Sequence, residues 1–458
     1  ILVVSLLLVA FLAMTAFAAH TMGKGDVPKK TRMNAHAYSF ADETGRFGTG
    51  SAGQVTLGTV AYSAASASPG KQVGATYYDY QHNCSMGRMI ETGPHSGITG
   101  PATVHFGWMY LPDAVLASRS YAYNAYISSS HSYAGVAILH DPDDEYSGYV
   151  NVDVTPDNRG IVGGHSDTKG PIPYQPQFHF DACSACEDFA AFLRVPDDVG
   201  GEAENTWPKF FFQFGTDTVL HVAAMEDDGR LYLKYFRCVG YEGVGTWDYP
   251  CYYVDTVEDI AQDITGERMG DRVCMSWFAC PPYQEPWCDT CSGLPTENYD
   301  GLLLSQMDND IYIQTSDNQG VNWNPRQNIT KVGPYGDAAW KAYCDASILF
   351  DQAGNLHLIW HASPWPADPE LDGVFEEFWQ GTEARLFHWS ENVPYLRTIA
   401  DHNYYSGDSC GTPAWALTVS KMTLSECDGK LYAIWSQFND IPNGIENDCA
   451  AWGYPDAY

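Results

Sequence analysis

The chain has 458 residues, and its 24 Lys and Arg against 57 Asp and Glu leave a formal net charge of −33 at pH 7. Nucleic acids and anionic membranes are bound through Lys and Arg, so this charge excludes unaided binding to either. A hydrophobic content of 45% is enough to build a core and excludes a disordered chain. The 42 Gly, 26 Pro and 14% aromatic residues favour turns and strands over long helices. We therefore expect a large, turn-rich, all-β protein.

The first 19 residues carry no charge. Ala16 and Ala18 stand two residues apart, in the small-x-small pattern that precedes a signal-peptidase cut. We expect residues 1–18 to be a signal peptide and residues 19–36 an N-terminal lead-in. The alternative is a retained anchor, since an uncharged run of this length can span a bilayer. Both interpretations predict a secreted, extracellular or cell-surface protein, and contact with a membrane is expected only if residues 1–19 are retained.

Thirteen cysteines fit an oxidising compartment, where they are expected to form disulfides whose pairing the sequence leaves open. Cys183–Cys186 and Cys288–Cys291 are Cys-x-x-Cys pairs. A zinc site shared by the two pairs is an alternative, although their separation does not suit the usual zinc ribbons. The odd count predicts one free or intermolecular thiol. We expect no cofactor, with Ca²⁺ on the acidic run at 141–145 as the alternative to a solvated loop.

A short apolar segment, often ending in Trp or His, recurs six times at intervals of several tens of residues. Units of this length hold about four short strands, as in the blade of a β-propeller. We expect residues 37–458 to form a single β-propeller of about six blades, six or seven, with a C-terminal portion missing from the sequence. A pair of β-sandwiches is the alternative. The six segments are 104–108, 161–165, 220–224, 273–277, 356–360 and 431–435.

Turn residues divide the chain in the same way. Asp, Asn and Gly tolerate the left-handed backbone of tight turns, and they stand beside these segments at 157–160, 227–229, 351–355 and 428–429. Residues 219–236 predict a β-hairpin. The Pro-rich residues 364–381 indicate a surface insertion, because Pro is excluded from central strands. Residues 255–263 are expected to form a short helix.

One motif points to a superfamily. Ser316, Gly320 and Trp323 match the Asp-box, Ser/Thr-x-Asp-x-Gly-x-x-Trp, with Asn318 at the position of the Asp. The segment follows an apolar strand at 311–315, and it resembles the Asp-box (BNR repeat) of sialidase-like β-propellers. In such a box the Asx side chain caps a turn, Gly takes an unusual backbone angle, and Trp covers the hairpin. The resemblance implies a sialidase-like propeller, with the box distant from the active face.

The resemblance also implies a catalytic set: three arginines for a carboxylate, a Tyr–Glu nucleophile and an acidic acid/base residue. The family's first arginine lies in Phe/Tyr-Arg-Ile/Leu-Pro near the start, and the nearest segment is 193–196, which makes Arg194 the candidate. This segment has the wrong first residue and follows two expected blades, so an ordinary surface arginine is the alternative. Other arginines that could join a pocket are Arg88, Arg119, Arg237, Arg272 and Arg385.

Four histidines at or near the repeated strands, namely His105, His165, His221 and His357, would either bind a metal or pack within the sheets. We expect the protein to bind a glycan or an extracellular protein on one face of the propeller, and the motifs do not support catalysis. The alternatives are an exo-glycosidase of the sialidase type and a structural or adhesive component of an extracellular assembly.

Overall fold

The computed structural model describes residues 71–437 and 456–457, apart from the gaps given at the end of this paragraph. The predicted signal peptide and lead-in, the acidic run at 141–145, Cys288–Cys291 and the predicted insertion at 365–381 lie outside the described residues. The gaps are 79–80, 82–85, 95–101, 113–118, 140–145, 168–173, 190, 202, 228–230, 242–244, 258–260, 280–308, 331–339, 365–382 and 404–416.

The first three sheets are antiparallel and follow one another along the chain. Sheet 1 holds β1 (Ile90–Gly93), β2 (Thr103–Tyr110), β3 (Ser120–Ile127), β4 (Ser132–Tyr133) and β5 (Ala137–Leu139). Sheet 2 holds β6 (Ser147–Val154), β7 (Gly160–Asp167), β8 (Tyr174–Phe180) and β9 (Ala191–Arg194). After the single turn of helix α3 (Asp197–Gly200), sheet 3 holds β10 (Glu204–Phe214), β11 (Thr218–Asp227), β12 (Leu231–Val239), β13 (Thr246–Trp247) and β14 (Tyr252–Val257).

Three further antiparallel sheets complete the described chain. Sheet 4 holds β15 (Gln262–Gly266), β16 (Val273–Ala279), β17 (Asp310–Ser316) and β18 (Gln327–Asn328). Sheet 5 holds β19 (Trp340–Phe350), β20 (Leu356–Pro364), β21 (Glu383–Ser390) and β22 (Val393–Asn403). Sheet 6 holds β23 (Val419–Cys427), β24 (Lys430–Gln437) and β25 (Asp456–Ala457).

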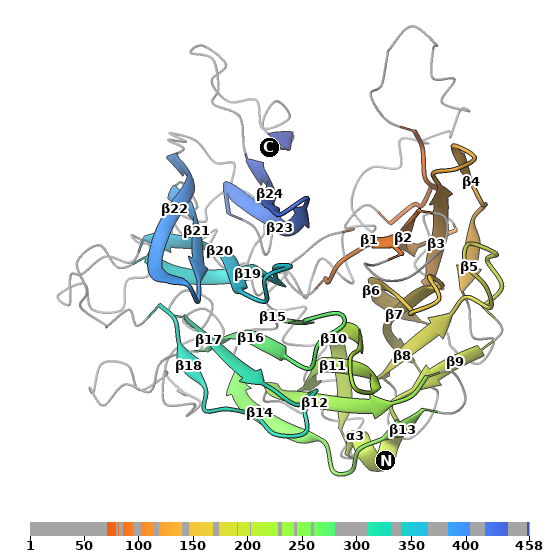
Figure 1. Ribbon diagram of the computed structural model, residues 1–458, viewed down its shortest axis with the longest axis horizontal. Helices are drawn as coiled ribbons and strands as arrows, with labels where there is room; N and C mark the ends of the chain where they lie inside the picture. The colour runs from red at the N-terminus through yellow and green to blue at the C-terminus, as the bar shows by residue number, and fades with distance from the viewer. Residues whose placement is uncertain are drawn as a thin grey trace, which may run out of the picture.

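The six sheets stand in chain order around a common centre (Figure 1). The first strand of each sheet packs against the first strand of the next: β1 on β6, β6 on β10, β10 on β15, β15 on β19 and β19 on β23. Each of the six apolar segments expected to repeat lies in the second strand of one sheet, namely β2, β7, β11, β16, β20 or β24. The prediction of an all-β propeller is therefore confirmed, and the hairpin expected at 219–236 is formed by β11 and β12.

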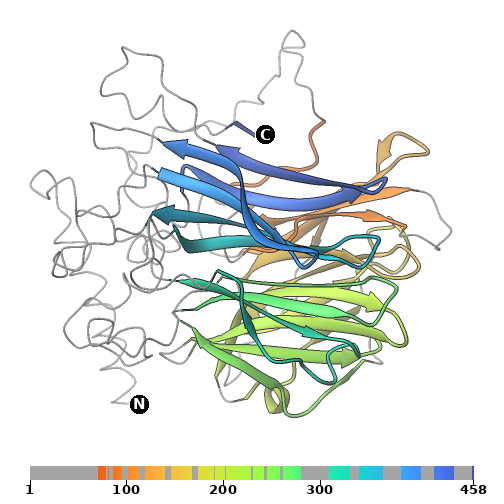
Figure 2. The same cartoon turned by 60° about the vertical axis from the view of Figure 1, so that its left-hand side comes forward.

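The strand directions give the molecule two distinct ends. In sheets 2 to 6, the first strand runs toward a short turn that leads into the second strand, and we call this end the turn face. The opposite end, where the first strands begin, is the loop face. In Figure 2 the short turns after the first strands gather at the right-hand end of the sheets.

Aromatic side chains fill the space between the sheets. The larger core cluster runs from sheet 1 to sheet 6 and contains fully buried Trp277 and Trp360. A smaller cluster between sheets 2 and 3 is dominated by phenylalanines, namely Phe178, Phe180, Phe210, Phe212 and Phe214. The surplus of aromatic residues in the sequence thus serves, in part, to pack one sheet on the next.

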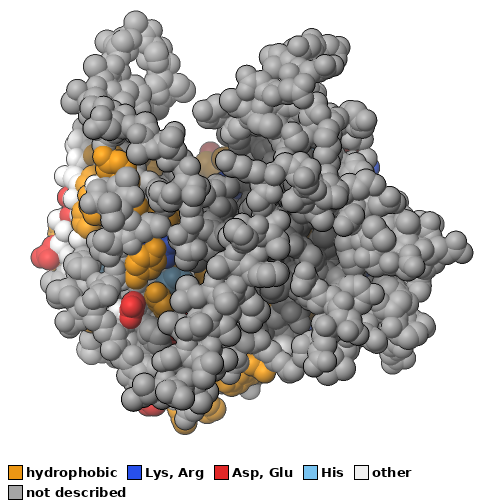
Figure 3. Space-filling view, turned by 180° about the vertical axis from the view of Figure 1, so that it is seen from behind, with side chains coloured by type: hydrophobic (Ala, Val, Ile, Leu, Met, Phe, Trp, Pro, Cys, Tyr) orange, Lys and Arg blue, Asp and Glu red, His pale blue; other side chains and the backbone are white. Residues whose placement is uncertain are grey.

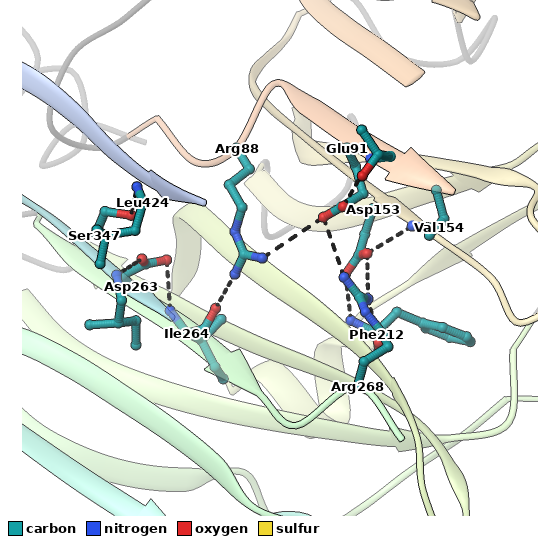
Figure 4. A network of polar contacts seen from close by, with 12 residues as sticks. Arg88, Glu91, Asp153, Val154, Phe212, Asp263, Ile264, Arg268, Ser347 and Leu424 are labelled. Carbon is teal, nitrogen blue, oxygen red and sulfur yellow. Dashed lines mark hydrogen bonds and ion pairs between the residues drawn. The ribbon is translucent and has the colours of Figure 1, made fainter. Parts of the chain in front are cut away.

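Polar side chains on the first strands join successive sheets by hydrogen bonds (Figure 4). The Asp153 carboxylate of β6 accepts from the backbone N–H of Phe212 in β10, at 2.7 Å. Asp263 of β15 accepts from Ile348 of β19 at 3.0 Å, and the Ser347 hydroxyl of β19 accepts from the Leu424 N–H of β23 at 3.1 Å. Each bond satisfies a buried backbone donor that an inner strand would otherwise leave unpaired.

An ionic network crosses the centre near the turn face (Figure 4). Arg268 lies between β15 and β16, and its guanidinium bonds to Asp153 at 2.5 Å and to Glu91 at 3.3 Å. Arg88 donates to the Ile264 carbonyl at 2.8 Å. Both arginines also lie over the ring of Phe211, at 5.6 Å for Arg88 and 4.3 Å for Arg268. Through these contacts, β1 and the residues before it are joined to sheets 2, 3 and 4.

Two expectations about local structure have definite outcomes. The helix expected at 255–263 is wrong, because residues 252–257 form β14 and residues 262–266 form β15. Two adjacent tyrosines and two valines make residues 252–257 a good edge strand. In the described residues, no helix is long and apolar enough to cross a membrane.

The cysteine prediction is confirmed at one pair. Cys183 and Cys186 form a disulfide, so these two sulfurs do not serve a shared zinc site. Five other cysteines in the described part of the chain carry no disulfide, contrary to expectation. Cys238, Cys274 and Cys344 among them are buried in strands, where a thiol packs as a small apolar side chain.

Candidate functional site

The segment that carried the sequence resemblance forms a tight turn after β17, on the turn face. The Ser316 hydroxyl accepts from the Gly320 N–H at 2.9 Å, and the Asn318 side-chain oxygen accepts from the Asn322 N–H at 2.8 Å. Gly320 has φ +77°, and a Cβ there would collide with the Tyr235 hydroxyl. Trp323 packs edge-on against Tyr235 of sheet 3, with ring centroids 4.8 Å apart. The turn therefore fixes sheet 4 to sheet 3, as a structural element does.

A second turn has the same arrangement, a side-chain oxygen that accepts from backbone N–H groups and an aromatic ring packed on the neighbouring sheet, but its sequence does not match the motif. It follows β8, and the Asp181 carboxylate accepts from the backbone N–H groups of Cys186, Glu187 and Asp188 at 3.0–3.2 Å. Phe189 then packs edge-on against Tyr123 of sheet 1, with centroids 4.9 Å apart. Asp181 takes the place of the serine and Phe189 that of the tryptophan. The sequence analysis missed this turn because only the geometry is shared.

Arg194 lies in β9, the outer strand of sheet 2. Its guanidinium donates to Gln177 at 2.7 and 3.2 Å and lies 5.5 Å from the ring of Phe192. Its role in binding stays a prediction. The five other arginines are spread over different sheets: Arg237 bonds to Asp248, Arg272 to Glu391, and Arg385 covers the ring of Trp340. Arg88 donates to the Ile264 carbonyl and Arg119 to the Ser147 carbonyl.

The four histidines lie in separate sheets and do not meet. His105 bonds to Tyr123 at 2.7 Å, His221 to Tyr235 at 2.7 Å, and His357 to His388 at 3.1 Å. Burial lowers the pKa of His105 to about 4 and that of His221 to about 3, so both are neutral at physiological pH. Among the described residues, no group of three or more His, Cys, Asp or Glu side chains is arranged to hold a metal ion.

On the loop face, ionisable and aromatic side chains of sheets 1, 2 and 3 come together, and we call them the loop-face cluster. Asp167 ends β7 and pairs in register with Tyr174, the first residue of β8. Figure 3 views the molecule from the loop face. Apolar, basic and His side chains are visible close together there, on the side of sheets 1 and 2. The cluster consists of Tyr78, Arg119, Tyr146, Tyr149, His165, Asp167, Tyr174 and Glu204.

Arg119 is the buried centre of the cluster, immediately before β3. Its Nε donates to the Ser147 carbonyl at 2.8 Å and its Nη1 to the Tyr78 hydroxyl at 3.3 Å. Its guanidinium carbon lies 4.5–5.5 Å from the ring centroids of Tyr78, Tyr146 and Tyr149. Three electron-rich faces stabilise the buried cation. Arg119 is thus bound within the protein, and it holds the tyrosines in fixed positions.

His165 and Tyr174 lie beside this arginine, with ring centroids 5.3 Å apart. The His165 Nδ1 accepts from the Trp207 N–H of β10 at 3.0 Å, which places the proton of the neutral ring on Nε2. Burial, and then the Arg119 charge, lower the pKa of His165 well below its usual value. Burial, and then the Asp167 charge, raise the pKa of Tyr174 to about 12, with Glu204 adding to the rise.

A second cluster of ionisable side chains lies on the first strands of three sheets. It consists of Lys209 of β10, Asp345 of β19 and Lys421 of β23. Burial raises the pKa of Asp345 from 3.8 to about 7, against the opposing charges of both lysines and a hydrogen bond from the Lys421 backbone. Burial lowers the pKa of Lys421, and Asp345 opposes this shift. A carboxyl group with a pKa near 7 can exchange a proton at physiological pH, as a general acid does.

The loop-face cluster offers both aromatic surface and hydrogen-bond acceptors. The partly exposed Tyr146 and Tyr174 offer aromatic surface, and the partly exposed Asp167 and Glu204 offer hydrogen-bond acceptors. Such a set suits a ligand with both apolar faces and hydroxyl donors.

The six sheets and this polar cluster at one end of them define a β-propeller with a candidate ligand site on its loop face. No model of a known protein family matches the chain, and no curated protein matches it. The fold assignment rests on the sheets themselves.

Several solved structures resemble this one at low identity. A Trypanosoma rangeli sialidase in complex with sialic acid is 9% identical, with a TM-score of 0.41, over 76% of this chain and 51% of that one. The NanB sialidase from Streptococcus pneumoniae is 7% identical, with a TM-score of 0.43, over 85% and 69%. The polysaccharide lyase Uly1 is 12% identical, with a TM-score of 0.39, over 82% and 91%. This chain spans about half the length of the Trypanosoma rangeli enzyme.

Proposed function

We propose that this protein is a secreted or cell-surface β-propeller that binds a glycan at its loop-face cluster. The observation that carries the proposal is the meeting of two partly exposed tyrosines with two partly exposed carboxylates at the loop-face ends of β6, β7, β8 and β10. Tyrosine rings stack on the C–H faces of sugars, and carboxylates accept hydrogen bonds from sugar hydroxyls.

Two further features support a glycan over a charged ligand. The net charge of −33 repels polyanions unless cations are concentrated in one pocket, and the Arg119 donors Nε and Nη1 are bonded within the protein. The turn at 316–323 resembles an Asp-box, which supports placing the protein with the sialidase-like propellers. The uncharged residues 1–19, as a signal peptide or an anchor, support the extracellular location.

The test is binding to a glycan array, followed by titration calorimetry with the best ligand. Replacing Tyr174 by Ala is expected to weaken binding about ten-fold, since a lost stacking contact of about 1.4 kcal/mol has that effect. Tyr395→Ala is the matched control, because Tyr395 is 57% exposed on the outer strand β22 of another sheet. An array without hits, or equal losses in both variants, would contradict the proposal and favour a structural or adhesive role.

The second candidate function is an exo-glycosidase, and the raised pKa of Asp345 favours it. Glycosidases require a carboxyl group that is protonated near neutral pH to protonate the leaving oxygen. Hydrolysis of a fluorogenic sialoside, reduced at least 100-fold in Asp345→Asn, would support this function. A loss in Arg194→Ala would additionally support the arginine inferred from the sequence resemblance. Absence of hydrolysis across a panel of glycosides would remove the candidate.

A further inference from the structure

The two end sheets of the described arc leave apolar faces uncovered. In sheet 6, alternate residues of β24 point to opposite sides. Leu431, Ala433 and Trp435 pack on the core toward sheet 5, whereas Tyr432 and Ile434 are 48% and 50% exposed on the other side. Figure 1 places β23 and β24 at one end of the arc and β1 and β2 at the other.

Sheet 1 has an exposed apolar residue on the face that is turned away from sheet 2. Gly107 and Met109 of β2 face sheet 2, so the residues between them face the other way. Ile90 of β1 is paired in register with Phe106 and is 58% exposed. Exposed apolar side chains at both ends of the described arc mark a surface that another segment can bind.

The chain itself leads into this region. Residues 71–77 lie against sheet 1 on the side of Phe106: the Asn124 side chain, paired with Phe106, donates to the Val73 carbonyl at 2.7 Å. A Cβ on Gly74 would collide with the ring of Trp108. The Tyr77 N–H bonds to the Leu111 carbonyl at 3.1 Å, at the loop-face end of β2. The residues before Lys71 therefore join the described chain on this face.

We propose that residues 47–70, which lie outside the described part of the chain, cover the exposed apolar face of β24 and Ile90. This run of 24 residues contains no Asp, Glu, Lys or Arg, in a chain that is 18% charged, so its burial against apolar surface requires no desolvation of charge. At about 3.3 Å per residue it is long enough to cross a sheet of this size more than once. The run at 438–455 fits less well because it carries Asp440, Glu446 and Asp448.

Photo-cross-linking of the full-length protein tests the proposal. A benzoylphenylalanine at position 432 replaces one aromatic side chain by another, and the same change at Tyr395 is the control, since that tyrosine is comparably exposed on β22. Mass spectrometry of the monomeric product is expected to find peptides from 47–70 joined to position 432 but not to position 395. Joining to 438–455, joining to a second copy of the chain, or no product at 432 would overturn the proposal.

A thermal measurement gives an independent readout. A charge on a covered face must be desolvated, so Ile434→Asp is expected to lower Tm by about 3 °C or more. Ile399→Asp on β22, where the side chain is 39% exposed, is the control and is expected to shift Tm by less than about 1 °C. Equal small shifts in both variants would show that the face is open to solvent, and would overturn the proposal.

Discussion

Buried ionisable side chains decide the chemistry at the scale of single residues. Arg119 and Asp345 are both almost fully buried, but their surroundings differ. Three tyrosine rings and two hydrogen-bond acceptors stabilise the Arg119 cation, whereas desolvation dominates at Asp345 and outweighs two nearby lysines. One group is therefore a fixed charge that positions its neighbours, and the other changes its charge near neutral pH.

Asp345 should make stability depend on pH. Its folded-state pKa of about 7 lies above the value of 3.8 for an ordinary Asp, so the folded state binds more protons between these limits. The free energy of unfolding should then fall as the pH rises from about 4 to about 7, by up to about 4 kcal/mol. Urea unfolding of wild type and Asp345→Asn across this range measures the difference. An identical pH dependence in both would contradict the shift.

The repeated apolar strands could be predicted from the sequence, whereas the loop-face cluster could not. The second strands were predictable because each is a dense apolar run, such as Leu356–Trp360 in β20. The first strands carry polar residues such as Asp153 and Asp263, whose carboxylates accept hydrogen bonds from backbone N–H groups of the next sheet. Because of these polar residues, a search for apolar runs does not find the first strands.

The candidate site could not be read from the sequence for a different reason. Arg119, Tyr174 and Glu204 are spread over 86 positions and three sheets, and only the folding of those sheets brings them together. The motif that was readable, at 316–323, is a local turn whose characteristic hydrogen bonds lie within eight residues. Local patterns thus identify turns, whereas a site assembled from several sheets leaves no spacing to recognise.

At the scale of elements, the turn after β8 has two supports, the disulfide and the Asp181 carboxylate. The disulfide closes a loop of four residues, so losing it is expected to cost about 2 kcal/mol. Asp181→Ala leaves three backbone N–H groups without their acceptor and is expected to cost at least about 3 kcal/mol.

Denaturant unfolding of Cys183→Ser/Cys186→Ser and of Asp181→Ala compares the two supports. Asp181→Asn keeps one acceptor oxygen in place and is expected to fall between wild type and Asp181→Ala. If the cysteine variant were the less stable of the two, the disulfide and not the carboxylate would be the main support of this turn.

For the molecule as a whole, the centre near the turn face is held by charge as well as by packing. Arg268→Met should cost about 3–5 kcal/mol, because it leaves the buried Asp153 without its partner. The double variant Arg268→Met/Asp153→Asn should recover most of that loss, since residue 153 then carries no charge and Glu91 keeps Arg88 at 4.0 Å. Thermal unfolding of the three proteins measures both effects. A double variant no more stable than Arg268→Met would contradict the ionic explanation.

The histidine pairs link the inside of one sheet to the turn of the next. In sheets 1, 3 and 5, a histidine of the second strand bonds diagonally to an aromatic side chain of the third: His105 to Tyr123, His221 to Tyr235 and His357 to His388. In the described residues, the turns that cover the first two pairs come from sheets 2 and 4. The buried pair therefore recurs in every second sheet of the described chain. In the first two cases one sheet supplies the pair and the next sheet supplies the aromatic ring that covers it, so each pair depends on the correct docking of two sheets.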